Sequence, residues 1–286
     1  MTKTRPTAVA GSFYPGSRSQ AVSMLDKFFS NVASNVNFTA FKEKVKHSKA
    51  KIHGIIVPHA GWVYSGEVAA YAYDLIKDKG FTKFILLGPN HTAYVDKAYV
   101  DDSDYWQTPL GKVSVSKDKI SNPYFLYSSA PHVQEHDLEV QIPFLQYIFA
   151  KQAHGHQSSQ SHQLTEANFT IMPIIVGELK IDAFDSVVKA LTSIYDDKTL
   201  FIISTDLSHY MPIDEAQKTD THTIKIIQNL AFEKAGQMDA CGKVPLLIAM
   251  LLCKAFGTSP IPLKYATSGE ASGEYNSVVG YVSMMF

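Results

Sequence analysis

Three short apolar runs along the chain each lead within a few residues to a histidine. They are residues 55–57 before His59, residues 84–87 before His91, and residues 200–203 before His209. Short apolar runs bounded by Pro, Gly or Ser are typical of buried strands in an α/β sheet. Open α/β sheets bind ligands beyond the carboxyl ends of their strands. We therefore expect the three imidazoles to meet at one sheet edge, as in many metal or catalytic sites.

Helical and extended patterns alternate along the rest of the chain. Helical spacing of apolar residues predicts helices over 17–32, 65–77, 137–150, 182–195, 213–230 and 243–256. Further strands are predicted over 52–57, 169–176, 263–266 and 277–285, with a hairpin or edge insertion within 98–130. The polar, lysine-rich stretch 42–51 is predicted to be a solvated connection. This alternation indicates an α/β fold.

Composition narrows the class of protein. The 286 residues carry 26 basic and 27 acidic side chains, so the basic excess of a nucleic-acid-binding protein is missing. No apolar stretch reaches the roughly 18 residues of a membrane span. The N-terminal residues lack a signal-peptide core, so we expect a cytoplasmic protein without nucleic-acid or membrane partners. Since neither a repeat nor a linker interrupts the pattern, we expect one domain over 1–286.

His59 and His91 lie 32 positions apart, close to the length of one βαβ unit, roughly 30 residues. This spacing places them at equivalent points on two parallel strands, where they can meet. The alternative is that each is a turn residue, since Pro58 precedes one and Gly88 begins the turn that leads to the other.

Asp206 and His209 stand three residues apart directly after a predicted strand. A carboxylate beside an imidazole fixes its tautomer and raises its basicity, which suits a general base. The alternative is that Ser204, Thr205 or Asp206 caps a helix, and both roles can hold at once. Further along, His136 and Glu139 either line the same cleft or, as part of an acidic first turn, merely suit a helix dipole.

The two cysteines are too few for a disulfide framework. Cys241 precedes an apolar helix and lies two residues from Lys243, a setting that predicts a lowered pKa and a role as soft metal ligand or nucleophile. It can also be an ordinary turn residue. Cys253 falls among apolar residues in the middle of that helix and is predicted to be a core residue.

Two other features of the sequence bear on function. A histidine-rich tract, with His154, His156 and His162, lies among glutamines and serines and is predicted to be a solvated loop. A glycine-rich phosphate loop of either common type is missing from the sequence, which argues against a nucleotide-dependent enzyme.

Six segments together resemble the Memo family, whose bacterial and archaeal members are often called AmmeMemoRadiSam system protein B. They are AGSFYP, PHAGWVYSG, LLGPNH, EHDLEVQIPF, STDLSHY and DACGK, in the family's order and spanning about residues 5–286. The resemblance implies a three-layer α/β/α sandwich around a mostly parallel sheet, similar to class III extradiol dioxygenases of the LigB type. The eukaryotic relative's link to cell motility and metal handling belongs to eukaryotic signalling and is not transferred here.

The resemblance also implies a site. In the dioxygenases two histidines and a glutamate hold Fe(II), whereas the Memo pocket has two histidines and a cysteine, which match His59, His91 and Cys241. The family's further pocket residues match Asp206 and His209. A thiolate in place of a carboxylate softens the donor set, so copper or zinc can bind as well as iron. Dioxygenase activity therefore does not follow from the fold.

Three functions remain open at this point. The first is a metal-dependent oxidoreductase acting on a small molecule or peptide, with His209 as acid–base residue and iron or copper favoured over zinc. The second is a non-catalytic binding or metal-handling module with a vestigial pocket, and the third is metal-assisted hydrolysis. Aromatic side chains near the motifs can supply the pocket wall: Trp62, Tyr64, Tyr94, Tyr105, Trp106 and Tyr210. The family name also implies a functional link to a radical-SAM protein.

Overall fold

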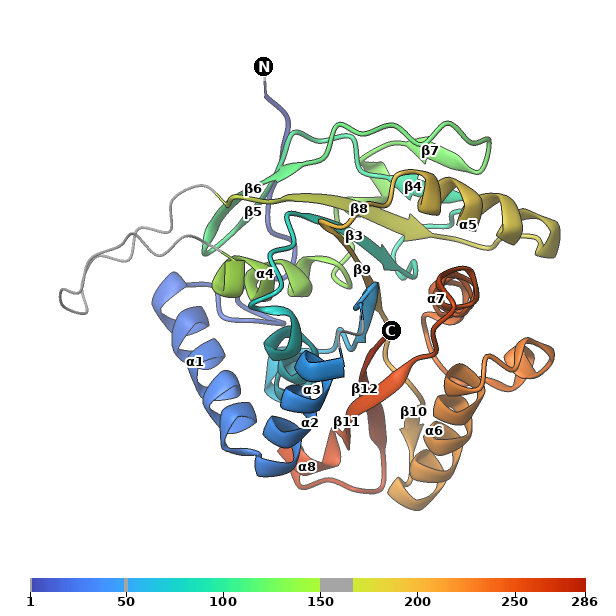
Figure 1. The fold of residues 1–286 in the computed structure, drawn as a ribbon. Coiled ribbons are helices and arrows are strands. Elements are labelled where there is room, and N and C mark those ends of the chain that lie inside the picture. Colours follow the sequence, from blue (N-terminus) through green and yellow to red (C-terminus); the bar gives the residue numbers. More distant parts are fainter. Residues whose placement is uncertain (1, 49–50, 150–166) are drawn as a thin grey trace.

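The computed structural model describes residues 2–48, 51–149 and 167–286, which form helices on both faces of one large sheet (Figure 1). The α-helices are α1 (Arg18–Ser34), α2 (Val36–Ser48), α3 (Trp62–Ile76), α4 (Ile142–Phe149), α5 (Phe184–Ser193), α6 (Ile213–Gln228), α7 (Lys243–Phe256) and α8 (Gly269–Ser272). Short 3-10 helices are η1 (Ala130–His132), η2 (Glu139–Gln141), η3 (Ile181–Ala183) and η4 (Phe232–Gln237).

The described strands all belong to that sheet. They are β1 (Thr4–Arg5), β2 (Gly54–Val57), β3 (Lys83–Gly88), β4 (Ala98–Val100), β5 (Tyr105–Thr108), β6 (Gly111–Val115), β7 (Phe125–Tyr127), β8 (Thr170–Val176), β9 (Thr199–Ser204), β10 (His209–Met211), β11 (Ile261–Thr267) and β12 (Val278–Met285). Their order is β1-β5-β6-β8-β3-β9-β2-β12-β10, with β11 on β12, β4 on β8 and β7 on β4. The central run β6-β8-β3-β9-β2 is parallel, whereas β10, β11 and β12 pair antiparallel.

Successive residues of the central strands face opposite sides of the sheet, which creates two hydrophobic cores. Ile55 and Val57 belong to the core shared with α1 to α4, while Ile56 between them belongs to the core shared with α5 to α7. The helices of each group lie on their own side of the sheet in Figure 1. Fully buried strands covered on both faces are continuously apolar, which explains the uninterrupted runs in the sequence. The α/β/α expectation is confirmed.

The register of the central strands sets up the site. β9 lies between β2 and β3 and pairs parallel with both, so that the carboxyl ends of all three strands reach the same edge. Val57 is opposite Ser204, and Thr205 donates its backbone N–H to the Val57 carbonyl at 2.9 Å. His59 and Asp206 therefore lie at equivalent points, each two residues beyond this pair.

Two predicted segments differ from the structure. Residues 42–48, predicted to be a solvated connection, belong to helix α2, which buries Phe38 and Val45. Its many lysines hide this narrow apolar face from the pattern, and Lys42 pairs with the buried Asp74. The helix predicted over 137–150 begins as an α-helix only at Ile142, because residues 137–141 form a turn and a 3-10 helix that contribute side chains and carbonyls to the site.

In the described ranges, no helix combines the length and the apolar character that a membrane crossing requires. The histidine-rich tract with His154, His156 and His162 lies outside the described residues.

Candidate metal centre

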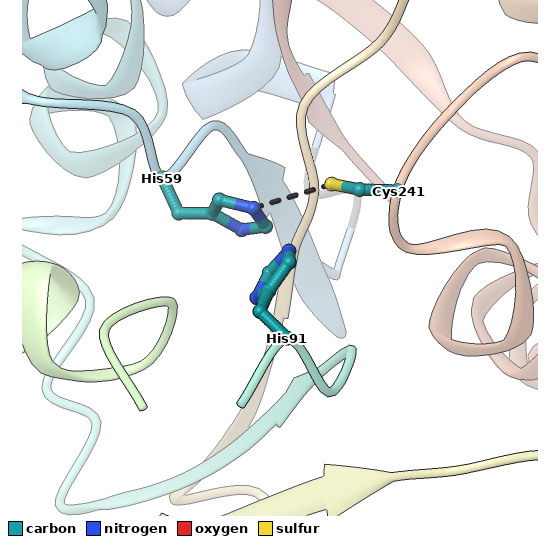
Figure 2. Close-up of side chains that lie close together, drawn as sticks. All are labelled: His59, His91 and Cys241. Carbon is teal, nitrogen blue, oxygen red and sulfur yellow. Dashed lines mark hydrogen bonds between the residues drawn. The ribbon is translucent and has the colours of Figure 1, made fainter. Parts of the chain in front are cut away.

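Three distant segments bring two imidazoles and one thiol together (Figure 2). His59 follows β2, His91 follows β3, and Cys241 lies just before α7. One ligand atom from each lies within 4.8 Å of those of the other two, and His59 Nε2 is 3.2 Å from Cys241 Sγ. His59 is buried, Cys241 is half-buried and His91 is exposed, so the group opens to solvent on the His91 side. Two nitrogens and one sulfur at this spacing form a plausible donor set for iron, copper or zinc.

The tautomer of His59 follows from the hydrogen bonds beneath it. Gln141 donates from Nε2 to the Pro58 carbonyl at 2.8 Å and to Ser204 Oγ at 3.1 Å. Ser204 uses its single proton to donate to the Asp137 carbonyl at 2.8 Å. Ser204 Oγ therefore accepts from His59 Nδ1, 3.0 Å away. His59 thus carries its proton on Nδ1, which leaves the Nε2 lone pair facing Cys241.

Cys241 is held close to the end of β9 by its backbone. Its N–H donates to the Asp206 carbonyl at 3.3 Å, and the next residue, Gly242, donates to Thr205 Oγ1 at 3.0 Å. A Cβ on Gly242 would lie 2.7 Å from the Thr205 side chain, closer than real Cβ contacts. Glycine is therefore required at position 242 for the backbone to come close to Thr205 and place the Cys241 thiol beside His59.

The expected lowering of the Cys241 pKa is wrong for the metal-free protein. Burial, and to a smaller extent the negative charge of Asp206, raise the pKa of the Cys241 thiol to about 12. The Lys243 side chain is exposed, so water screens the positive charge that the sequence suggested would help. A metal that binds here must displace the thiol proton, as metals do at thiolate sites.

Asp206 lies beside His59. Its Oδ1 accepts the His59 backbone N–H at 2.8 Å, and its Oδ2 is 3.9 Å from His59 Nε2. Burial raises the pKa of Asp206 to about 6, against the opposing effects of the His59 N–H and the His209 ring. Among the described residues, no hydrogen bond joins the Asp206 and His209 side chains. His209 begins β10 and is partly exposed. Next to it, Tyr210 is exposed and has a φ of 60°, an uncommon conformation for a side chain of this size.

A third imidazole and a carboxylate complete the cluster. The His136 ring centroid is 4.7 Å from that of His91 and 5.4 Å from that of His59, so of the two alternatives that the sequence left open, His136 takes the one beside the other imidazoles. Glu135, which sequence reasoning missed, has Oε1 at 2.9 Å from His91 Nδ1 and 3.1 Å from His136 Nδ1. Burial works against its charge, but hydrogen bonds from His136 and His91 hold the pKa of Glu135 well below its usual range. Its position beside His136 in the EHD segment was the available signal.

Three other sequence candidates have different surroundings. The Glu139 carboxylate pairs with Arg5 at 2.6 Å and accepts the Ala8 and Val9 backbone N–H groups and the Tyr14 hydroxyl, so it anchors the N-terminal segment. Trp62 is buried among core aromatic rings and donates from Nε1 to the Val140 carbonyl.

The third of these candidates is Tyr64. Its side chain is 45% exposed and is available to a ligand at the surface. Among the other aromatic candidates, Tyr94 and Tyr210 are exposed in the same way, whereas Trp106 is buried beneath the Arg5 guanidinium. Aromatic side chains at the surface therefore remain for a pocket wall, but the two tryptophans do not.

Comparison with known proteins finds similar sequences over nearly the whole chain. The model of the family described as Memo-like protein matches residues 5–285. MEMO1 family proteins from Aquifex aeolicus and Sulfolobus acidocaldarius are each 33% identical to this chain over 99% of both sequences. A MEMO1 family protein from Thermoplasma acidophilum is 31% identical over 98% of both.

Proposed function

Because the chain belongs to the family of Memo-like proteins, we propose that it is a metal-dependent oxidoreductase of dioxygenase-like ancestry. His59, His91 and Cys241 hold the metal, and iron or copper is favoured over zinc because the reaction class needs a redox-active ion. The observation that carries the proposal is the convergence of these three ligand atoms within 4.8 Å of one another. Three protein ligands leave coordination positions open for a substrate.

The surrounding side chains define what the protein itself contributes. The bound metal would supply electron transfer, and the protein would orient the reactants and move protons. His209 is proposed as the acid–base residue and Asp206 as its charged neighbour. Asp206 accepts the His59 backbone N–H, and the His209 ring lies close enough to lower the pKa of both His59 and Asp206. The substrate, a small molecule or peptide, would enter on the exposed His91 side.

The metal content of the protein tests the site. Protein purified anaerobically should hold about one iron or copper ion per chain by elemental analysis. A His59→Ala/His91→Ala double variant and a Cys241→Ser variant should lose it, because each removes ligand atoms. Cys253→Ala is the matched control, since Cys253 is a buried core thiol. Equally low metal in wild type and double variant would sink the proposal.

Catalysis needs a separate experiment. Metal-loaded protein is screened for oxygen consumption with candidate small molecules and peptides. We expect His209→Gln to lose about 10²- to 10⁴-fold in turnover, the usual contribution of acid–base catalysis, while keeping its metal. Turnover that is unchanged in His209→Gln would remove this residue from the mechanism.

A second candidate function is a non-catalytic binding or metal-handling module. The observation that favours it is the thiol of Cys241, because soft thiolates suit Cu(I) capture and transfer. On this alternative, the loaded protein passes its metal to an acceptor chelator quickly and turns over none of the screened compounds. Metal-dependent turnover would decide for the oxidoreductase.

A further inference from the structure

Five donors converge on the buried carboxylate of Glu135. Oε1 lies 2.9 Å from His91 Nδ1, 3.1 Å from His136 Nδ1 and 3.0 Å from the His136 backbone nitrogen. Oε2 accepts the His91 backbone N–H at 2.7 Å and the Thr92 hydroxyl at 3.4 Å. Glu135 is only 2% exposed, so these groups take the place of water around it.

This arrangement dictates where two imidazole protons lie. An ionised carboxylate can only accept hydrogen bonds, and a neutral imidazole has one N–H and one bare nitrogen. Both Nδ1 atoms lie within 3.1 Å of the same oxygen, an arrangement that favours a proton on each of them. The bare Nε2 of His91 is then free for a metal, and His136 offers a second Nε2 lone pair close by. Carboxylate–histidine–metal arrangements of this kind orient ligands in many metal sites.

We propose that Glu135 is the positioning residue of this centre. Through one carboxylate oxygen it holds His91 as the ligand tautomer. Through the same oxygen it also orients His136, which does not bind the metal. The Nε2 lone pair of His136 would then accept a hydrogen bond from an N–H or O–H group of a molecule bound to the metal. This inference deepens the proposed metal site and rests on it, but the tautomers themselves exist without the metal.

A rival arrangement gives Glu135 a different role. His91, Glu135 and His136 also have ligand atoms within 4.8 Å of one another, so Glu135 can be imagined as a ligand of a second ion. The two arrangements differ in proton content, because a metal held by Glu135 and the two Nδ1 atoms requires both of those nitrogens to be bare. Proton positions and metal count therefore separate them.

The experiment reads the tautomers directly in the metal-free protein. Long-range ¹H–¹⁵N correlation spectra of ¹⁵N-histidine-labelled protein distinguish Nδ1–H from Nε2–H rings, with each signal assigned from single His→Gln variants. We expect His91 and His136 both to be Nδ1–H. His132 is the internal control with the opposite form, because its Nε2 donates to the Tyr99 carbonyl at 2.9 Å and its Nδ1 has no partner in the structure.

The variants then test the cause. Glu135→Gln should disturb both tautomers, because an amide can donate as well as accept, whereas Glu178→Gln at an exposed site should disturb neither. Metal affinity, measured by chelator competition, should fall by about 10- to 100-fold in Glu135→Gln. His136→Gln should keep the wild-type metal count.

An Nε2–H form of His91 or His136 in the wild type, or two metal ions per chain with one lost in His136→Gln, would overturn the proposal. The wild-type spectrum decides this even if Glu135→Gln fails to fold. Expected tautomers in a protein that binds no metal would leave the positioning role standing and refute the metal site instead.

Discussion

Two buried carboxylates four residues apart, Glu135 and Glu139, organise two different regions of the molecule. Glu135 holds His91 and His136 at the edge of the sheet, where one side of the cluster meets solvent. Glu139 holds Arg5 and the segment that follows it, away from solvent. Each carboxylate is surrounded by donors, but the partners of the first can bind a metal and those of the second cannot. Residue type and burial therefore do not identify a functional carboxylate, whereas its partners do.

Removing Glu139 should give the largest effect on stability. Glu139→Ala leaves the buried Arg5 guanidinium without its ion-pair partner, and breaking such a pair costs about 3–5 kcal/mol. Urea unfolding should show a loss of this size, with Glu178→Ala, at an exposed site, as the matched control. Metal bound per folded chain should stay within about twofold of wild type. A metal loss as large as that of a ligand variant would show that the two regions are not separate.

The corresponding change at Glu135 should have the opposite result, with a large loss of metal affinity and a smaller loss of stability. Glu135→Ala removes the acceptor that orients His91 and should lower metal affinity by about 10- to 100-fold. Its unfolding free energy should fall by less than that of Glu139→Ala, because the His91 side chain is 29% exposed and can be solvated. Chelator competition and urea unfolding on the same samples measure both quantities. A stability loss that exceeds the one in Glu139→Ala would contradict the contrast.

Ser204 should behave like a weaker version of Glu135. Ser204→Ala removes the acceptor of His59 Nδ1, 3.0 Å away, and leaves the Gln141 amide without one of its partners. We expect roughly a tenfold loss of metal affinity, at the lower end for such supporting residues. Chelator competition again measures it. Unchanged affinity would mean that the His59 tautomer does not depend on Ser204.

The smallest effect should come from the second thiol. Cys253→Ala changes a buried core residue on α7 that contacts none of the candidate ligands, so metal affinity should stay within about twofold. Core truncation of this size should still cost up to about 1 kcal/mol in stability. Metal loss in this variant would mean that the effect of Cys241→Ser reflects general damage to the fold.

Much of the architecture could be predicted from the sequence because the central strands are continuously apolar and end at turn residues. The meeting of His59 and His91 followed from the length of one βαβ unit. Helix α2 was missed because its lysines outnumber the buried Phe38 and Val45. The lysine-rich composition of the segment obscures its narrow apolar face.

The site was predicted less completely for a different physical reason. Glu135 and Glu139 look alike in the sequence, since both are acidic residues at a helix start. Their roles are set by partners far along the chain, His91 and Arg5, which no local pattern connects to them. The predicted lowering of the Cys241 pKa was wrong for the same reason. Burial beside Asp206 raises this pKa by more than the solvated Lys243 side chain lowers it.

X-ray absorption spectroscopy of the anaerobically purified, metal-loaded protein shows whether the imidazoles of His59 and His91 and the thiolate of Cys241 bind one metal ion. We expect one sulfur at about 2.3 Å, if the ion is zinc or of similar size, and two imidazole nitrogens at about 2.0–2.1 Å. The sulfur signal should disappear in Cys241→Ser. A shell of nitrogen and oxygen alone, identical in wild type and Cys241→Ser, would contradict this expectation.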